Sequence, residues 1–115
     1  MQNKQKKHLV CSLEELKNSK CLGLEINLDN AISQCFLVYH KNRVYSYLNR
    51  CPHTGVNLEW IPNQFLDTGN EFIQCSTHGA LFDIENGLCL RGPCVGEQLK
   101  NIENCLLEDN IYLIL

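Results

Sequence analysis

The chain has 115 residues, of which 44% are hydrophobic and 20% charged, a balance that predicts one folded domain with a single hydrophobic core and excludes a disordered chain. The formal net charge of −3 argues against a nucleic-acid partner, which would need a basic surface. No stretch approaches the ~20 apolar residues that span a membrane. Because no apolar stretch of signal-peptide length follows the basic segment 1–7, we expect a cytoplasmic protein whose cysteines stay reduced.

The first half of the chain predicts a short helix followed by antiparallel strands. Residues 1–7 are polar, and no regular structure is expected there. Ser12 and Glu15 have the spacing of a capping box, which predicts a helix near 13–18. Strands are predicted at 21–26, 32–40 and 43–48, and Val44, Tyr45 and Tyr47 give the last of them β-branched and aromatic character. The last two are joined by a hairpin turn at 40–42.

The second half predicts shorter strands between turn-rich segments. Residues 58–70 include Pro62, Gly69 and several Asn and Asp residues, so a connection is expected there. Asn86-Gly87 is typical of a tight turn. Strands are expected at 71–74, 81–83, 88–90, 101–107 and 111–115, of which the last two form a hairpin across 108–110. The elements together predict an all-β chain with one or two short helical turns.

Two mixed cysteine–histidine pairs stand in the loops of this predicted chain. They are Cys51-Pro-His53, after the strand at 43–48, and Cys75-Ser-Thr-His78, after the strand at 71–74. Two thiolates with two imidazoles are the ligand set of a Rieske [2Fe–2S] centre. The 21 residues between His53 and Cys75 are enough chain to leave one loop, cross the domain and return on a second. The pattern therefore predicts two loops that clamp one cluster.

The stretch from Cys51 to about Val95 resembles the cluster-binding subdomain of Rieske-type ferredoxins. The resemblance rests on Cys51-Pro-His53-Thr-Gly55, Cys75-Ser-Thr-His78-Gly79-Ala80-Leu-Phe82-Asp83, Asn86-Gly87 and Gly92-Pro93. It implies the all-β Rieske fold, in which a small antiparallel β-sandwich base carries an inserted cluster-binding subdomain, here at about 50–96 within a single domain 1–115. It also implies that the two cysteines bind the inner iron, that the two histidines bind the outer iron, and that the segment at Gly92-Pro93 covers the cluster.

Two departures from the respiratory Rieske proteins indicate a subtype. Those proteins carry an extra cysteine in each loop, joined by a disulfide, where this chain has Val56 and Thr77. They also hydrogen-bond the cluster through a serine where this chain has Ala80. Fewer donors leave the negative charge of the cluster less stabilised, so we expect a reduction potential near the lower end of the Rieske range of roughly −150 to +300 mV.

The resemblance implies a soluble electron carrier rather than an enzyme. Rieske oxygenases add a mononuclear iron held by two histidines and a carboxylate, and this sequence contains no second ligand set of that kind. The electron is expected to pass through the iron that His53 and His78 hold. The expected donor is a flavin-dependent reductase, and the expected acceptor is an oxygenase or another oxidoreductase.

Two other functions remain open at the level of the sequence. The same fold occurs as the small redox subunit of a larger enzyme, as in assimilatory nitrite reductase. The same donors could instead hold a structural zinc ion in an interaction module, although zinc fingers usually pair Cys with Cys and His with His. Cys89 and Cys94 flank Leu90-Arg-Gly-Pro93, and they are interpreted either as packing residues or as a redox-sensitive pair.

Overall fold

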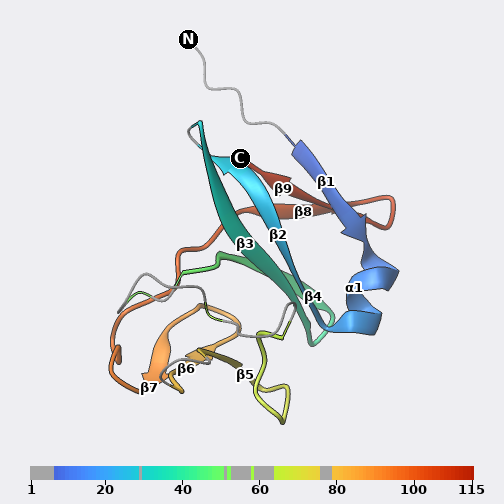
Figure 1. The fold of residues 1–115 in the computed structure, drawn as a ribbon. Coiled ribbons are helices and arrows are strands. Elements are labelled where there is room, and N and C mark those ends of the chain that lie inside the picture. Colours follow the sequence, from blue (N-terminus) through green and yellow to red (C-terminus); the bar gives the residue numbers. More distant parts are fainter. Residues whose placement is uncertain (1–6, 29, 51, 53–57, 59–63, 76–78) are drawn as a thin grey trace.

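The protein is described by a computed structural model, which places residues 7–28, 30–50, 52, 58, 64–75 and 79–115. Within these ranges, nine strands and one helix form three antiparallel sheets of three strands each. Two of the sheets make up a base, and the third lies at one end of the molecule (Figure 1). None of the helices in the described ranges has the length and apolar character that crossing a membrane requires.

The strand order in each sheet follows from antiparallel pairing of near neighbours and of the two chain ends. The first base sheet has the order β1 (Lys7–Ser12), β9 (Asn110–Ile114), β8 (Asn104–Leu107). The second has the order β2 (Cys21–Leu28), β3 (Ala31–His40), β4 (Arg43–Leu48). The third sheet consists of β5 (Phe72–Gln74), β6 (Leu81–Asp83) and β7 (Cys89–Arg91). The all-β prediction is confirmed.

Strand β1 was not predicted, and its first residue, Lys7, falls in the segment 1–7 for which no regular structure was expected. Lys7 pairs with Ile114, and Ser12 pairs with Asn110, with a register shift between Leu9 and Cys11. The strand therefore forms against the opposite end of the chain. A short segment with a charged start gives little local strand signal, and the pairing that stabilises it is not visible in its own residues.

Helix α1 (Leu13–Ser19) begins where the capping box predicts. The backbone N–H of Glu15 donates to Ser12 Oγ at 3.1 Å, and the Ser12 N–H donates to Glu15 Oε1 at 3.1 Å. Two N–H groups that a helix N-terminus would leave unpaired are thus satisfied. Leu16 is fully buried in the base core, and Leu13 is partly buried against the same cluster, so the helix attaches to the base by its two apolar residues.

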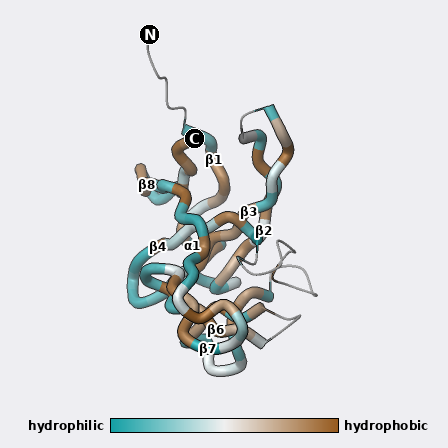
Figure 2. The backbone as a smooth tube through the Cα atoms, turned by 90° about the vertical axis from the view of Figure 1, so that its left-hand side faces the viewer, coloured by the Kyte–Doolittle hydropathy of each residue, from teal (hydrophilic) through white to brown (hydrophobic). Residues whose placement is uncertain are grey.

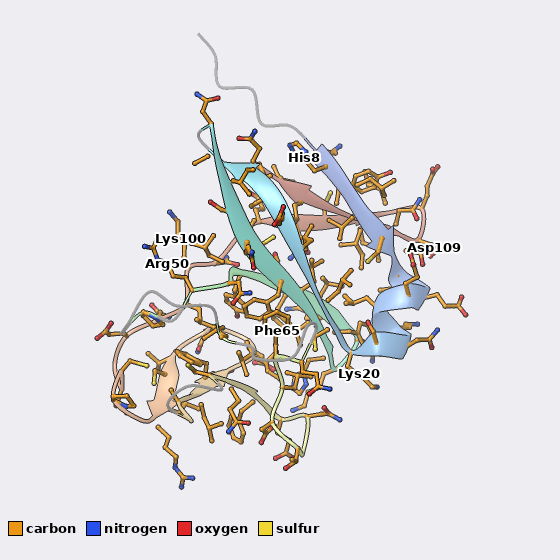
Figure 3. The ribbon with its side chains drawn as sticks, viewed as in Figure 1. His8, Lys20, Arg50, Phe65, Lys100 and Asp109 are labelled. Carbon is orange, nitrogen blue, oxygen red and sulfur yellow. The ribbon has the colours of Figure 1, made fainter. Side chains whose placement is uncertain are left out.

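The central strand β3 is buried on both faces. Cys35 and Leu37 pack in the clusters between the two base sheets. Phe36 and Val38, which point to the other face, belong to the cluster that includes the third sheet. Phe36 stacks on Phe65 with ring centroids 4.3 Å apart, and Phe65 lies between β3 and the third sheet (Figure 3). Hydrophobic stretches accordingly occur both in the base strands and around β6 (Figure 2).

Burial of Cys35 in β3 predicts a loss of stability at alkaline pH. Burial raises the pKa of this thiol to about 12, from an ordinary value of 9.0. Above pH 9 the unfolded chain therefore releases a proton that the folded chain retains, so stability falls as the pH rises from about 9 to about 12. Cys35→Val removes this thiol. Between pH 8 and pH 10, the unfolding free energy of the wild type should therefore fall by about 1.4 kcal/mol more than that of the variant.

Urea unfolding of both proteins at the two pH values measures this difference. All other ionisable groups are common to the two chains and cancel in the comparison. Parallel declines of the two unfolding free energies would show that Cys35 ionises equally in the folded and unfolded chains.

Candidate metal centre

Of the four predicted ligands, the structure describes Cys75. Cys51, His53 and His78 lie outside the described residues, as do the subtype positions Val56 and Thr77. Among the described residues, no three His, Cys, Asp or Glu side chains are grouped so that they could hold a metal ion. A centre built on Cys75 therefore needs ligands from outside the described ranges, which is where the predicted partners of Cys75 fall in the sequence.

Cys75 lies directly after β5, and its backbone is fixed at the mouth of a short loop. The Cys75 N–H donates to the carbonyl oxygen of Ala80 at 2.9 Å, and the Gly79 N–H donates to the Cys75 carbonyl oxygen at 2.8 Å. These bonds continue the pairing of Gln74 with Leu81 in the β5–β6 ladder. Gly79 has a φ of +69°, a conformation that favours glycine. The two ends of the predicted second ligand loop are thus bonded to each other.

The surroundings of Cys75 suit a thiolate that is bound to metal. The residue is fully buried and belongs to the same hydrophobic cluster as Leu58, Ala80 and Phe82. An isolated thiolate would be poorly solvated among such neighbours, whereas a coordinating thiolate shares its charge with the metal. The donor and its setting therefore fit an inner, solvent-excluded iron.

The first ligand loop is held closed by Asn49, which sequence reasoning missed. Asn49 is buried, with 4% of its surface exposed, and its N–H donates to the carbonyl oxygen of Gln34 at 2.8 Å. Its side-chain Oδ1 accepts a hydrogen bond of 2.8 Å from the N–H of Leu58. One amide side chain thus bridges the two ends of the loop that contains Cys51 and His53. A polar residue between a predicted strand and a ligand loop was the only sequence signal for it.

Asn49→Ala is expected to destabilise the fold by about 1–3 kcal/mol, because it leaves the buried N–H of Leu58 without this acceptor. The matched control is Asn86→Ala, since Asn86 Oδ1 accepts a 2.8 Å bond from the N–H of Leu88 at an exposed turn. There water replaces the lost acceptor, so the cost should be about 1 kcal/mol or less. Urea unfolding measures both, and equal costs would contradict the role assigned to Asn49.

A third segment contacts the end of the second ligand loop. Gly92 has a φ of +108°, and a Cβ added to it would lie 2.8 Å from the Cα of Ala80. The backbone at Gly92 therefore packs directly on Ala80, which is fully buried. Pro93 and Val95 follow on the exposed side of this turn. That the turn covers a cluster, as the sequence predicts, stays a prediction because the outer ligands are not among the described residues.

The inserted segment is tied to the base by a buried tyrosine. The hydroxyl of Tyr47 in β4 donates to the carbonyl oxygen of Ile84, just after β6, at 2.6 Å. Tyr47 is 2% exposed, and burial raises the pKa of its hydroxyl, so the group stays a donor throughout the neutral range. Gly87 lies against the Tyr47 ring, since a Cβ there would approach the ring within 2.9 Å. The loops are thus mounted on a fixed support.

Positive charge borders the start of the first ligand loop. Arg50 is exposed, and its N–H donates to the carbonyl oxygen of Leu48 at 2.9 Å. Lys100 is also exposed, and its carbonyl oxygen accepts a hydrogen bond of 2.8 Å from the N–H of Leu48. The two side chains lie near each other on one side of the molecule (Figure 3). A partner surface that meets this side therefore needs to accommodate cations.

The comparisons with known proteins identify one family. Residues 6–104 match the family model described as the Rieske [2Fe-2S] domain. A search of curated protein sequences found no match.

Solved structures with the same fold include redox proteins of an oxygenase system. The ferredoxin of carbazole 1,9a-dioxygenase from Nocardioides aromaticivorans IC177 aligns with a TM-score of 0.70 and 20% identity, over 93% of this chain and 95% of that one. A chain in a complex of reduced oxygenase and oxidized ferredoxin in carbazole 1,9a-dioxygenase aligns with a TM-score of 0.72 and 19% identity, over 96% of this chain and 94% of that one. A chain in the reduced complex between oxygenase and ferredoxin in carbazole 1,9a-dioxygenase aligns with a TM-score of 0.70 and 16% identity, over 95% of this chain and 28% of that one. These similarities confirm the predicted fold class.

Proposed function

The chain belongs to the Rieske [2Fe-2S] domain family, and from this membership we propose that it is a one-electron carrier for an oxygenase rather than an enzyme. The observation that carries the proposal is the family match over residues 6–104, within which Cys75 stands fully buried at the end of β5. The family implies one [2Fe–2S] cluster per chain, which supplies reversible one-electron oxidation and reduction.

We assign the ligands as Cys51 and Cys75 on the inner iron and His53 and His78 on the outer iron. The complete burial of Cys75 supports its assignment to the inner iron. The chain's own residues then have defined tasks. Asn49 fixes the ends of the first ligand loop, and the Cys75–Ala80 hydrogen bond fixes those of the second. Fixed loop ends limit the reorganisation on reduction, which favours fast electron transfer.

An oxygenase as acceptor is proposed by analogy with the solved structures. The ferredoxin of carbazole 1,9a-dioxygenase, and a chain in a complex of such a ferredoxin with its oxygenase, each align with this chain over more than nine-tenths of both lengths. The proposed donor is a flavin-dependent reductase. We further propose that residues 1–115 act as a single domain with the cluster-binding subdomain at about 50–96, and that the chain works in the cytoplasm, where structural disulfides are rare.

Electron paramagnetic resonance of the dithionite-reduced protein, with iron and zinc quantified on the same sample, tests the proposal. We expect a rhombic spin-half signal with a mean g below the free-electron value, about two irons per chain, and a potential near the lower end of the Rieske range. A silent, iron-free protein that holds one zinc ion would overturn the proposal in favour of an interaction module. Copurification with a large flavin or haem subunit would instead assign the chain to a stable enzyme complex.

A further inference from the structure

Two thiols outside the ligand set lie in contact beneath the turn that packs on Ala80. Cys94 Sγ donates to Cys89 Sγ at 3.0 Å, and Cys89 Sγ in turn donates to the carbonyl oxygen of Arg91 at 3.3 Å. Both cysteines are 1% exposed. A disulfide has an S–S bond of about 2.05 Å, so closing this pair requires the sulfurs to approach by only about 1 Å.

The backbone, not the side chains alone, holds the two cysteines at this separation. The Cys89 N–H donates to the carbonyl oxygen of Glu97 at 2.8 Å, and the Gly96 N–H donates to the Cys89 carbonyl oxygen at 3.3 Å. The Glu97 N–H donates to the Cys94 carbonyl oxygen at 2.9 Å. These three bonds make residues 89–97 a closed turn. The chain segments that a disulfide would join are therefore already in place.

We propose that Cys89 and Cys94 are a redox-active dithiol that closes to an intramolecular disulfide by exchange with a small-molecule disulfide such as oxidised glutathione. One thiolate attacks a glutathione sulfur, which breaks the S–S bond, forms a mixed disulfide and releases one glutathione. The second thiolate then displaces the other glutathione and forms the Cys89–Cys94 bond. In sum, the protein loses two electrons and two protons, and one glutathione disulfide becomes two glutathione molecules.

The pair is buried but lies close to solvent. The four residues between the cysteines are all exposed, and they are Leu90, Arg91, Gly92 and Pro93. The turn between the two cysteines is thus exposed, and a local opening of that turn would admit the oxidant. The cation of Arg91 stands two residues from Cys89 and favours an anionic disulfide such as oxidised glutathione.

A disulfide between Cys89 and Cys94 would affect the second ligand loop through Gly92. The residue lies between the two cysteines in the sequence, and its backbone packs on Ala80. A disulfide between positions 89 and 94 closes a ring of six residues around this contact and restricts the turn. Oxidation of the pair therefore fixes the segment that rests on the loop carrying Cys75.

The test equilibrates the purified holoprotein against a series of glutathione disulfide-to-glutathione ratios, followed by acid quenching, alkylation and peptide mass spectrometry. We expect the peptide with both cysteines to lose two hydrogens and to escape alkylation in a single two-electron transition. Cys89→Ser and Cys94→Ser should abolish this transition. Cys105→Ser should leave it unchanged, because Cys105 is a half-buried thiol in β8 on the base. Hydrogen exchange in residues 89–97 should slow in the oxidised wild type.

Three outcomes would overturn the proposal: persistent thiols at every ratio, a glutathione adduct that never resolves to the internal disulfide, or a disulfide that maps to other cysteines. Unchanged hydrogen exchange in the oxidised form would overturn the claim that closure restricts the turn. The readout does not depend on the cluster, since neither cysteine is an assigned ligand. Failure of the electron-carrier proposal would appear in the iron content and the resonance signal, and it would leave this thiol titration intact.

Discussion

Cys75→Ser is expected to abolish cluster binding, with iron falling from about two per chain to background and the visible absorption of the protein lost. The serine hydroxyl ionises far less readily than a thiol, and it is a poor ligand for iron in an apolar setting. The backbone bonds between Cys75 and Ala80 do not involve the side chain. The variant should therefore keep its β-sheet circular dichroism while it loses iron.

Cys105→Ser is the matched control for this substitution. It makes the same chemical change at a half-buried thiol on β8, within the base. We expect it to retain iron and the resonance signal of the wild type. If Cys75→Ser retained both irons and an unaltered spectrum, the assignment of Cys75 as a ligand would be wrong.

Gly92→Ala is expected to destabilise the protein by about 1–3 kcal/mol more than Gly96→Ala. Both glycines have a φ in the region that disfavours other residues, +108° and +95°, so the backbone penalty is common to the two variants. At Gly92 the added Cβ would lie 2.8 Å from the Cα of Ala80, whereas at Gly96 no atom of the described residues, chain neighbours aside, stands within 4 Å. The difference between the unfolding free energies of the two variants, measured in urea, therefore gives the cost of the contact with Ala80.

The same pair of variants tests whether the turn supports the second ligand loop. Displacement of Ala80 by the new methyl group moves the loop end that is bonded to Cys75. We therefore expect Gly92→Ala, but not Gly96→Ala, to release iron faster to a chelator. Equal stabilities and equal release rates would assign the whole effect to backbone strain and none to the contact.

Elements whose causes are local could be predicted from the sequence. The capping box at Ser12 and Glu15 fixed the start of α1 because both partners lie within four residues. The hairpin between β3 and β4 turns on Lys41 and Asn42, both with positive φ, and the predicted turn includes them. Strand β1 was missed because its partner, β9, lies about a hundred residues further along the chain.

The two Cys–His pairs stand out in the sequence for the same reason, since each consists of distinctive residues within a few positions, and their assignment as ligands stays a prediction. The residues that hold the ends of these loops could not be predicted. Asn49 acts through a hydrogen bond to Leu58, and nothing about its type distinguishes it from an asparagine in a turn. The packing of Gly92 on Ala80 joins two loops whose proximity depends on the completed fold. Such tertiary contacts leave no local pattern.

Strand β3 makes the base and the third sheet, β5-β6-β7, thermodynamically inseparable. Its residues 35–38 contribute alternately to the core between the base sheets and to the core beneath the ligand loops. Neither core can dissolve without exposing one face of a strand that the other core requires, so the chain should melt in one cooperative transition. The free energy released on binding the cluster therefore stabilises the whole fold against unfolding, including sheet β1-β9-β8 on the far side of the molecule.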